Sequence, residues 1–453
     1  MRQIFHPKHI LKHPADWILP LLITLASFNG LIKAVSGVRY APLVIDAALF
    51  GLLFAVFATR LLRDSLRIGL VDILAATFIL IAILGMFHPN IPSLQAGVEG
   101  FRKFAFMMIG FFVGRYLVNL TALKRLIGVL LAGSFFISLY GVKQFIFPTA
   151  LDYRLIELST ASPVTYLMGG HIRAFSTLAG PFHLGIYLAC TLLLLFAIWQ
   201  RYPNRRRLVV ILAVPMLAAL IMTVTKSNWV GLLAGVLTLI LLNSRQPLRL
   251  IWGLIVIGLI AGLVLYLLVW VSSITPGLET VYAGLQALLN PLEAPTFKFR
   301  LDLWNETVIP LMTRSPWFGY GTGSAGEGLI NLFENTSSTY IVAHNLYFKI
   351  QVELGLLGSL CFWSFLFYAL INIWLAGRRL QDRFLKIVSD WTLAFAVAIL
   401  IAGLTGAILD AYPVNLIFWL LLGISSRLPR YNASEDFYIR PPAGNSALAK
   451  PEG

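Results

Sequence analysis

Apolar runs of membrane-spanning length recur along almost the whole chain and restrict its possible folds more than any other feature. A run of about 17 to 25 residues is long enough to cross a hydrocarbon core of about 30 Å. Hydrophobic residues make up 58% of the chain and charged residues only 12%, whereas soluble domains carry roughly 25% charged residues. We therefore expect one all-α integral membrane domain.

The positions of these runs predict about twelve transmembrane helices. The expected spans are residues 17–36, 42–59, 69–87, 101–119, 124–147, 180–200, 207–224, 227–243, 250–271, 345–376, 386–408 and 412–427. With the N-terminus inside, most Lys and Arg residues fall in the inner loops, so the positive-inside rule places both termini in the cytoplasm. We expect residues 1–430 to form a single transmembrane domain with an uncleaved first span, and residues 431–453 a disordered cytoplasmic tail.

The net charge of +15 does not indicate nucleic-acid binding, because the Lys and Arg residues are dispersed in short loops between apolar runs. Cys190 and Cys361 both lie inside apolar runs, where a thiol behaves as a small hydrophobic group. We expect neither a disulfide framework nor a metal site, since no second His lies within three or four residues of His344 and acidic pairs with metal-binding spacing are missing.

Two extracytoplasmic segments, about 148–179 and 272–345, are longer than turns. In the second, Phe299, Leu303 and the residues 308–311 follow a roughly helical spacing, which predicts a short helix at the membrane surface. The stretch from Gly319 to Gly323 follows no strand of a βαβ unit, so we expect a flexible or tightly turning loop and no dinucleotide site. The whole of 272–345 is expected to act as a lid over a cleft at the membrane face.

Four residues can carry chemistry. Lys226 lies between two apolar runs and either binds an anion or reaches the lipid headgroups. Arg300 and Trp304 share one helix face, so that the indole can steady the guanidinium against an anion; the alternative is an interfacial anchor. His344, followed by Asn345, is placed where a neutral imidazole can take a proton from a hydroxyl, although a lone interfacial His is often structural.

Several sequence motifs follow one another in a fixed order. They are Arg173-Ala174-Phe175-Ser176 with Gly180-Pro181 and Gly185, Thr225-Lys226-Ser227-Asn228-Trp229-Val230-Gly231-Leu232-Leu233, Arg300-x-x-x-Trp304, Pro316-x-x-Gly319-x-Gly321, and His344-Asn345-x-Tyr347 with Glu353-x-Gly355-Leu356-Leu357-Gly358. Together, these motifs resemble those of the O-antigen ligase and Wzy-type polymerase superfamily. The resemblance covers roughly 170–360, and elsewhere it is limited to the number and hydropathy of the spans.

This resemblance implies a GT-C-like membrane glycosyltransferase of the bacterial inner membrane, with its active site on the periplasmic face. Such proteins transfer a glycan from undecaprenyl diphosphate to an acceptor hydroxyl without a metal, cofactor or nucleotide sugar. The acceptor is either lipid A core, as in a ligase, or a growing glycan, as in a polymerase. The sequence leaves these two acceptors open.

The residue chemistry agrees with that reaction. A departing diphosphate needs fixed cations, for which Arg173, Lys226 and Arg300 are the candidates, and His344 is the candidate general base for an inverting attack. Lys226 departs from the family pattern, which commonly has Arg, and it offers a point charge in place of a bidentate fork. The possible supporting residues are Trp304, Asn345, Asp410, Arg102 and Lys103, and the last two have headgroup anchoring as their alternative role.

Two other function classes remain open from the sequence. Twelve spans with both termini inside is also a transporter layout, and Asp46 and Asp72 within apolar runs can form a proton relay. However, no matched pair of Gly- or Pro-broken spans occurs in the two halves. A purely structural membrane subunit is the third possibility.

Overall fold

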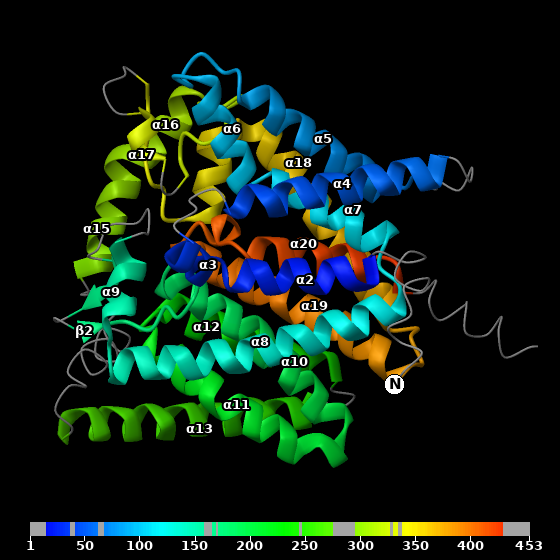
Figure 1. Ribbon diagram of the computed structural model, residues 1–453, viewed down its shortest axis with the longest axis vertical. Helices are drawn as coiled ribbons and strands as arrows, with labels where there is room; N and C mark the ends of the chain where they lie inside the picture. Colours follow the sequence, from blue (N-terminus) through cyan, green and yellow to red (C-terminus); the bar gives the residue numbers. More distant parts are fainter. Residues whose placement is uncertain are drawn as a thin grey trace, which may run out of the picture.

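In the computed structural model, most helices lie roughly parallel or antiparallel to one another and form one bundle (Figure 1). The structure describes residues 15–36, 41–61, 68–157, 165–168, 171–243, 247–274, 295–326, 329–333 and 338–428. The expected tail from 431 lies outside these residues, as do 275–294 of the long loop.

Helices account for nearly all of the described secondary structure. In the first half they are α2 (Ala15–Ser27), α3 (Asn29–Ser36), α4 (Ala41–Leu61), α5 (Leu70–Gly85), α6 (Leu94–Lys103), η2 (Phe106–Met108), α7 (Ile109–Tyr116), α8 (Leu120–Ile146), α9 (Ala150–Glu157), α10 (Pro181–Arg201), η4 (Pro203–Arg205) and α11 (Arg206–Met222). In the second half they are α12 (Lys226–Asn243), α13 (Pro247–Ile274), α15 (Pro295–Leu303), η5 (Trp304–Val308), α16 (Ile309–Arg314), α17 (Ile330–Phe333), α18 (Leu346–Gly377), α19 (Arg383–Ala402), η6 (Gly403–Thr405), η7 (Ile408–Asp410) and α20 (Val414–Ser425). The strands β1 (Leu167–Met168) and β2 (His171–Ile172) form one short antiparallel pair.

Each expected span overlaps at least one of these helices, which agrees with the all-α membrane character of the chain. Among the described residues, 5 helices are long and apolar enough to cross a membrane. They are Leu120–Ile146, Pro181–Arg201, Lys226–Asn243, Leu346–Gly377 and Arg383–Thr405. Shorter apolar helices occur at Asp16–Ser27, Leu43–Ala55, Leu70–Gly85, Phe106–Tyr116 and Val414–Ser425. The total of twelve spans stays a prediction.

Two expected spans are divided between separate helices, and in each a hydrogen bond from elsewhere in the fold lies at the break. The span 17–36 breaks at Phe28, where the Gly30 N–H donates to the carbonyl of Thr177 at 3.0 Å. The span 101–119 breaks after Lys103, whose carbonyl accepts a hydrogen bond of 3.1 Å from the Asn415 side chain. A polar partner elsewhere in the fold thus takes the place of part of the helical hydrogen-bond ladder.

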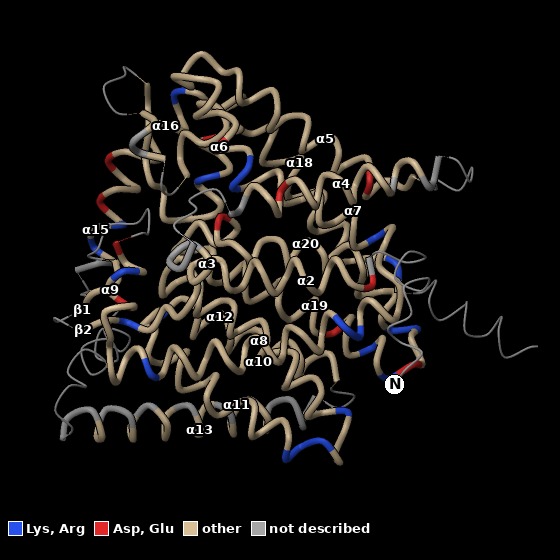
Figure 2. Tube along the Cα trace, viewed as in Figure 1, with Lys and Arg blue, Asp and Glu red and all other residues tan. Residues whose placement is uncertain are grey.

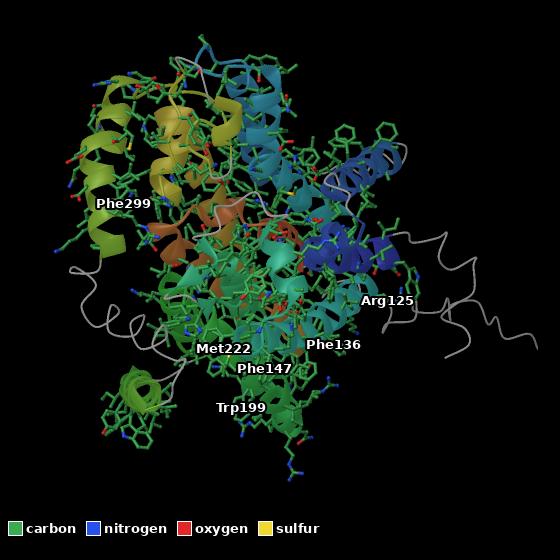
Figure 3. The ribbon with its side chains drawn as sticks, turned by 60° about the vertical axis from the view of Figure 1, so that its left-hand side comes forward. Arg125, Phe136, Phe147, Trp199, Met222 and Phe299 are labelled. Carbon is green, nitrogen blue, oxygen red and sulfur yellow. The ribbon has the colours of Figure 1, made fainter. Side chains whose placement is uncertain are left out.

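The bundle core is apolar, and charged residues gather mainly near its two ends (Figure 2). Helices α10, α19 and α20 are buried along most of their length, with Trp391 and Trp419 among the largest fully buried side chains. In contrast, α13 lies apart from the rest (Figure 3), and its apolar side chains, such as Trp252 and Leu259, are exposed. An apolar helix exposed in this way suits contact with lipid.

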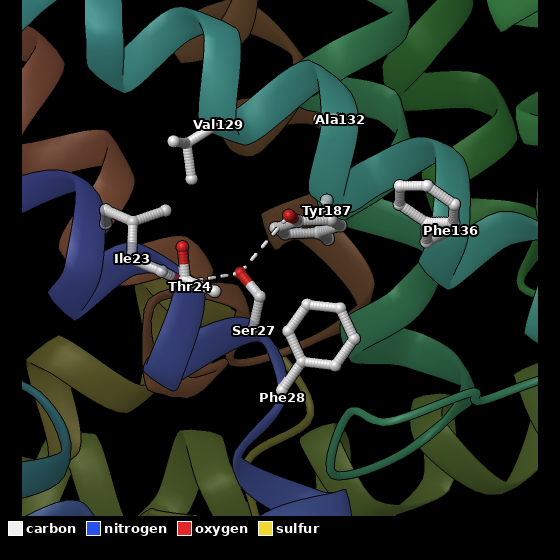
Figure 4. Close-up of a pocket in the computed structure, with 9 residues that line it drawn as sticks. Ile23, Thr24, Ser27, Phe28, Val129, Ala132, Phe136 and Tyr187 are labelled. Atoms are coloured by element: carbon white, nitrogen blue, oxygen red, sulfur yellow. Dashed lines mark hydrogen bonds between the residues drawn. The ribbon is translucent and has the colours of Figure 1, made fainter.

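A cavity of about 220 Å³ lies between α2, α8 and α10 (Figure 4). Its lining is mainly apolar, with Phe136 on one side, and the Ser27 hydroxyl donates to the Tyr187 hydroxyl at 3.2 Å. None of the candidate site residues from the sequence lines this cavity. The candidate site lies elsewhere, at the end of the bundle where α9, the two strands and α15 lie together (Figure 1).

Candidate active site at the loop end of the bundle

Three cations that are far apart in the sequence come together at this end of the bundle. The ammonium of Lys226 lies in the electric fields of Arg300 and Arg173. All three side chains are partly buried, so their mutual repulsion is screened less than it would be in water. The structure thus assembles the three residues that we predicted from sequence as the diphosphate-binding set, although it tests no role for them.

The guanidinium of Arg173 is held by backbone carbonyls. It donates to Thr223 at 2.9 Å, to Val224 at 3.2 Å and to Thr165 at 3.1 Å. These bonds use three of its five N–H donors and leave its charge unneutralised, because a carbonyl carries no net charge. Burial lowers the pKa of Arg173 to about 10, so the side chain remains a cation at neutral pH.

A buried network behind Arg173 fixes the segment that carries it. Gln144 accepts the N–H groups of Phe175 at 2.9 Å and Ser176 at 2.7 Å, and its own amide donates to Asp152 at 3.1 Å. Asp152 is fully buried and pairs with Lys143 at 2.7 Å. Sequence reasoning missed the position of Gln144, because a polar residue inside an apolar run gives no sign of its partner.

Residues of the motif around Lys226 fix the turn between α11 and α12 by hydrogen bonds and close packing. The Asn228 amide donates to the carbonyl of Phe182, in the first turn of α10, at 2.9 Å, and the Trp229 indole donates to Leu220 at 3.0 Å. A Cβ on Gly231 would lie 2.8 Å from the carbonyl oxygen of Ala398, so only Gly allows α12 to approach α19 this closely. The motif thereby fixes where α12 begins and hence the position of Lys226.

A short helix, α15, occurs in the long loop where one was predicted, followed by the π-helical turn η5 and by α16; its location at the membrane surface stays a prediction. Trp304 opens η5, and its indole donates to the carbonyl of Ala343 at 2.8 Å. Its ring also meets Phe348 edge-on, with ring centroids 5.5 Å apart. Trp304 therefore joins the helix that carries Arg300 to the residue before His344, whereas the predicted stacking of Arg300 on this indole stays a prediction.

Two of the family motifs form one structural unit. At Gly355, with φ of +62°, the backbone of α18 leaves the helical conformation, and the loop segment 316–321 inserts into the break. Tyr320 and Gly321 donate to the carbonyls of Val352 at 2.8 Å and Glu353 at 2.9 Å. The N–H groups of residues 356 and 357 donate to the carbonyls of residues 316 and 317. Backbone groups released by the break are thus satisfied, as a broken helix in a membrane requires.

The second part of the long loop is hydrogen-bonded to the bundle, and the lid role of 272–345 stays a prediction. Gly319, Gly321 and Gly323 all have positive φ, which confirms the tightly turning loop. Thr322 donates to the carbonyls of Ala82 and Gly85 on α5, at 2.6 Å and 3.1 Å. Segment 316–326 therefore forms a fixed wall.

His344 and Asn345 lie at the start of α18, as expected. Asn345 is its N-cap: its side chain accepts the N–H groups of Tyr347 and Phe348 at 2.8 Å and 3.0 Å and donates to the carbonyl of Leu404 at 2.9 Å. His344 has φ of +47°, a conformation that costs a non-glycine residue about 1–2 kcal/mol. Such strain is typical of functional sites, and the capped helix holds His344 in this conformation.

Positive φ marks two other places beside the site. Among the described residues that are not glycine, Ser176 and Val224 share this feature with His344. Ser176 follows Arg173 by three residues, and Val224 precedes Lys226 by two. A β-branched residue such as valine is a genuine outlier in this region, so the backbone is strained next to each of these candidate residues.

The structure also pairs the remaining predicted residues. Asp410 lies 3.1 Å from Lys349, a buried cation that sequence reasoning missed although its i,i+4 spacing with Glu353 was a visible signal. Arg102 pairs with Asp46 at 3.1 Å and with Glu99 at 2.8 Å, and the carbonyl of Lys103 is the one that accepts from Asn415. Whether Asp410, Arg102 and Lys103 assist the reaction stays a prediction.

The two acids that suggested a proton relay each face an arginine. Asp46 accepts from Arg102, and Asp72 pairs with Arg115 at 2.8 Å. Among the described residues, no group of three or more His, Cys, Asp or Glu side chains is placed to hold a metal ion.

Residues 211–363 match the protein-family model described as O-antigen ligase. A comparison with curated proteins finds no match. The matched segment includes Lys226, Arg300 and His344, and therefore most of the site described above, while Arg173 lies outside it. It also contains the inserted loop segment and the break in α18. The match over residues 211–363 supports the resemblance of this multi-pass membrane chain to the O-antigen ligase and Wzy-type superfamily, as the motifs predicted.

Proposed function

We propose that the chain is an integral-membrane, metal-independent, inverting glycosyltransferase of the bacterial inner membrane. It transfers a glycan from undecaprenyl diphosphate to the hydroxyl of an acceptor, which is lipid A core or a growing glycan. The observation that carries this proposal is the placement of Lys226 within the fields of Arg173 and Arg300. Cations placed near one another favour the binding of a polyanionic ligand such as a diphosphate.

In the proposed reaction, a ring nitrogen of His344 takes the proton of the acceptor hydroxyl. The acceptor oxygen then bonds to the anomeric carbon from the side opposite the diphosphate. The bond between that carbon and the diphosphate oxygen breaks, and the electron pair leaves with the diphosphate. Arg173, Lys226 and Arg300 stabilise the negative charge that develops on this leaving group. One displacement of this kind inverts the anomeric carbon.

Transfer by purified protein in nanodiscs tests the proposal directly. The donor is an undecaprenyl-diphosphate glycan, and the acceptor is either lipid A core or a second donor molecule, with products identified by mass spectrometry. We expect transfer to one acceptor, unchanged by a metal chelator, and a decrease of about 10²- to 10⁴-fold for His344→Ala. If His344→Ala transferred as fast as the wild type, His344 would not be the base; if the wild type transferred to neither acceptor, the proposed function would be wrong.

A further inference from the structure

A buried group of three charged side chains takes no part in the chemistry proposed above. Lys349 and Glu353 lie one turn apart on α18, with side chains only 2% and 0% exposed. The ammonium of Lys349 lies 3.1 Å from a carboxylate oxygen of Glu353 and 3.1 Å from one of Asp410. It also lies 4.0 Å from the centre of the Phe104 ring. Two carboxylates and one aromatic face thus account for the three donors of the ammonium.

Each partner of Lys349 belongs to a different part of the site wall. The second oxygen of Glu353 accepts the N–H of Ala325, in the wall segment 316–326, at 3.3 Å. The next residue, Gly326, packs on the ion group: a Cβ there would lie 3.4 Å from Glu353 and 3.6 Å from Asp410. Asp410 ends η7, in the turn between α19 and α20. The ammonium therefore links α18, the wall segment and this turn.

The turn between α19 and α20 forms a second contact with α18, at the residue that follows His344. Asn345 donates to the carbonyl of Leu404 in η6 at 2.9 Å, and Lys349 reaches Asp410 in η7 one helical turn further along. These two links hold the segment 403–410 against the start of α18. Because His344 immediately precedes Asn345, its position depends on how firmly that segment is held.

Stability alone is a poor explanation for this arrangement. Removing charges from water is expensive, and apolar residues of similar volume often stabilise a protein as well as a buried ion group does. If all three groups are ionised, two carboxylates and one ammonium leave a net negative charge in the interior, which increases that cost. Such a buried ion group is better suited to fixing one relative position of the segments that carry its charges.

We infer that Lys349 is a positioning residue for the transfer reaction: its ammonium, shared by Glu353 and Asp410, joins three segments of the site wall and thereby fixes His344. This inference rests on the proposed function. It predicts that the turnover step is sensitive to Lys349 while donor binding is not, because the cations that bind the donor are held by other contacts. A misplacement of about 1 Å can lower a rate about 100-fold.

The experiment compares the wild type with Lys349→Met, Lys349→Arg and the double variant Lys349→Met with Glu353→Gln. The double variant removes one buried carboxylate together with the ammonium, so it remains informative if the single Met variant does not fold. For each protein we would measure kcat, the KM for the undecaprenyl-diphosphate glycan, and hydrogen exchange of the backbone N–H groups of residues 321–326.

For both Met-containing variants we expect kcat to fall about 30- to 100-fold, KM to stay within about threefold, and exchange at 321–326 to quicken. Lys349→Arg keeps a cation that can meet two carboxylates, so it should recover kcat to within about tenfold of the wild type. A wild-type kcat in the double variant, or unchanged exchange in the folded Met variants, would overturn the inference. Hydrogen exchange needs no substrate, so it tests the link between Lys349 and the wall segment even if the wild type shows no transfer. An absence of transfer would contradict only the proposed function.

Discussion

Lys226 and Arg173 are held in different ways, and this difference affects what each can do for a diphosphate. Three N–H groups of Arg173 donate to backbone carbonyls, which holds the guanidinium in place and leaves two N–H groups for a ligand. Lys226 begins α12, and its ammonium ends a flexible four-carbon stem. We interpret Arg173 as the fixed cation of the site and Lys226 as the adjustable one.

The first prediction concerns Lys226, where the family commonly has Arg. Lys226→Met should weaken binding of undecaprenyl diphosphate about 10- to 100-fold, because a charge-assisted hydrogen bond contributes about 1.5–3 kcal/mol. Lys226→Arg keeps the charge and adds a bidentate fork, so its affinity should equal or exceed that of the wild type. Titration of the ligand against nanodisc-embedded protein measures both. Equal affinity for Lys226→Met and the wild type would remove Lys226 from the binding set.

A second prediction at this scale concerns Asp152 and its effect on stability. Burial alone would raise the pKa of this carboxyl, but the hydrogen bonds led by Lys143 hold the pKa below its ordinary value. A lowered pKa means that the ionised group stabilises the fold above its unfolded pKa, near 4, and that this contribution is lost as the pH falls through the folded value. Asp152→Asn should therefore destabilise the protein by about 1–3 kcal/mol at neutral pH.

Thermal unfolding in detergent at several pH values checks this. The gap in Tm between wild type and Asp152→Asn should stay constant from about pH 8 to pH 5 and narrow only below about pH 4. Asp302→Asn is the matched control, since Asp302 is exposed on α15 and its replacement should change Tm little. An equal effect of both variants would show that the network behind Arg173 does not depend on the charge of Asp152.

At the scale of secondary-structure elements, the break in α18 explains why two separate sequence motifs occur together. The Pro-x-x-Gly-x-Gly segment fills the break that Gly355 creates, and the two exchange backbone hydrogen bonds in both directions. The loop is thereby built into the helix. Membrane helices that are broken in this way often border binding sites, and this break lies about three turns along the helix that His344 precedes.

The third prediction concerns Gly355. Gly355→Ala should destabilise the protein by at least about 2 kcal/mol, because φ of +62° disfavours alanine and the new Cβ would overlap the carbonyl of Trp317. Gly128→Ala is the control: Gly128 lies in α8 with no atom within 4 Å of an added Cβ, so alanine should be neutral or slightly stabilising. The Tm values of both variants and of the wild type measure this difference in stability. A Tm of Gly355→Ala equal to that of the control would show that this conformation is not needed.

The sequence predicted the helices, the short loop helix and the start of α18 better than the links between them. Apolar runs and helical spacing are local signals, and they predicted α15 and the start of α18 at His344. The partners of Gln144 and Lys349 are distant in the sequence, and local spacing contains no information about which carbonyl or carboxylate they will meet. The division of 101–119 was missed for the same reason, because the side-chain amide that donates a hydrogen bond to the Lys103 carbonyl belongs to Asn415 on α20.

At the scale of the whole molecule, the site brings together elements from both halves of the chain. Arg173 follows β2, Lys226 begins α12, Arg300 lies on α15 and His344 precedes α18. The family match covers the last three, and the network of α8 and α9 supports the first. The strand β2 and the helices α9 and α15 lie at one end of the bundle, and the basic connection between α10 and α11 lies at the other (Figures 1 and 2). The proposed reaction therefore requires that the first of these ends faces the periplasm.

The last prediction tests this orientation by cysteine labelling. Cys190 is buried and Cys361 is half-buried, so replacing both with alanine gives a background without native thiols. In that background, Lys298→Cys on α15 and Asn204→Cys in η4 each place one thiol at an exposed position, at opposite ends of the bundle. A membrane-impermeant maleimide should label Lys298→Cys in intact spheroplasts, and Asn204→Cys only after the membrane is opened, because the positive-inside rule keeps the Arg-rich turn in the cytoplasm. Labelling in the reverse pattern would place the cation cluster on the cytoplasmic side and contradict the proposed direction of transfer, whatever the activity of the purified protein.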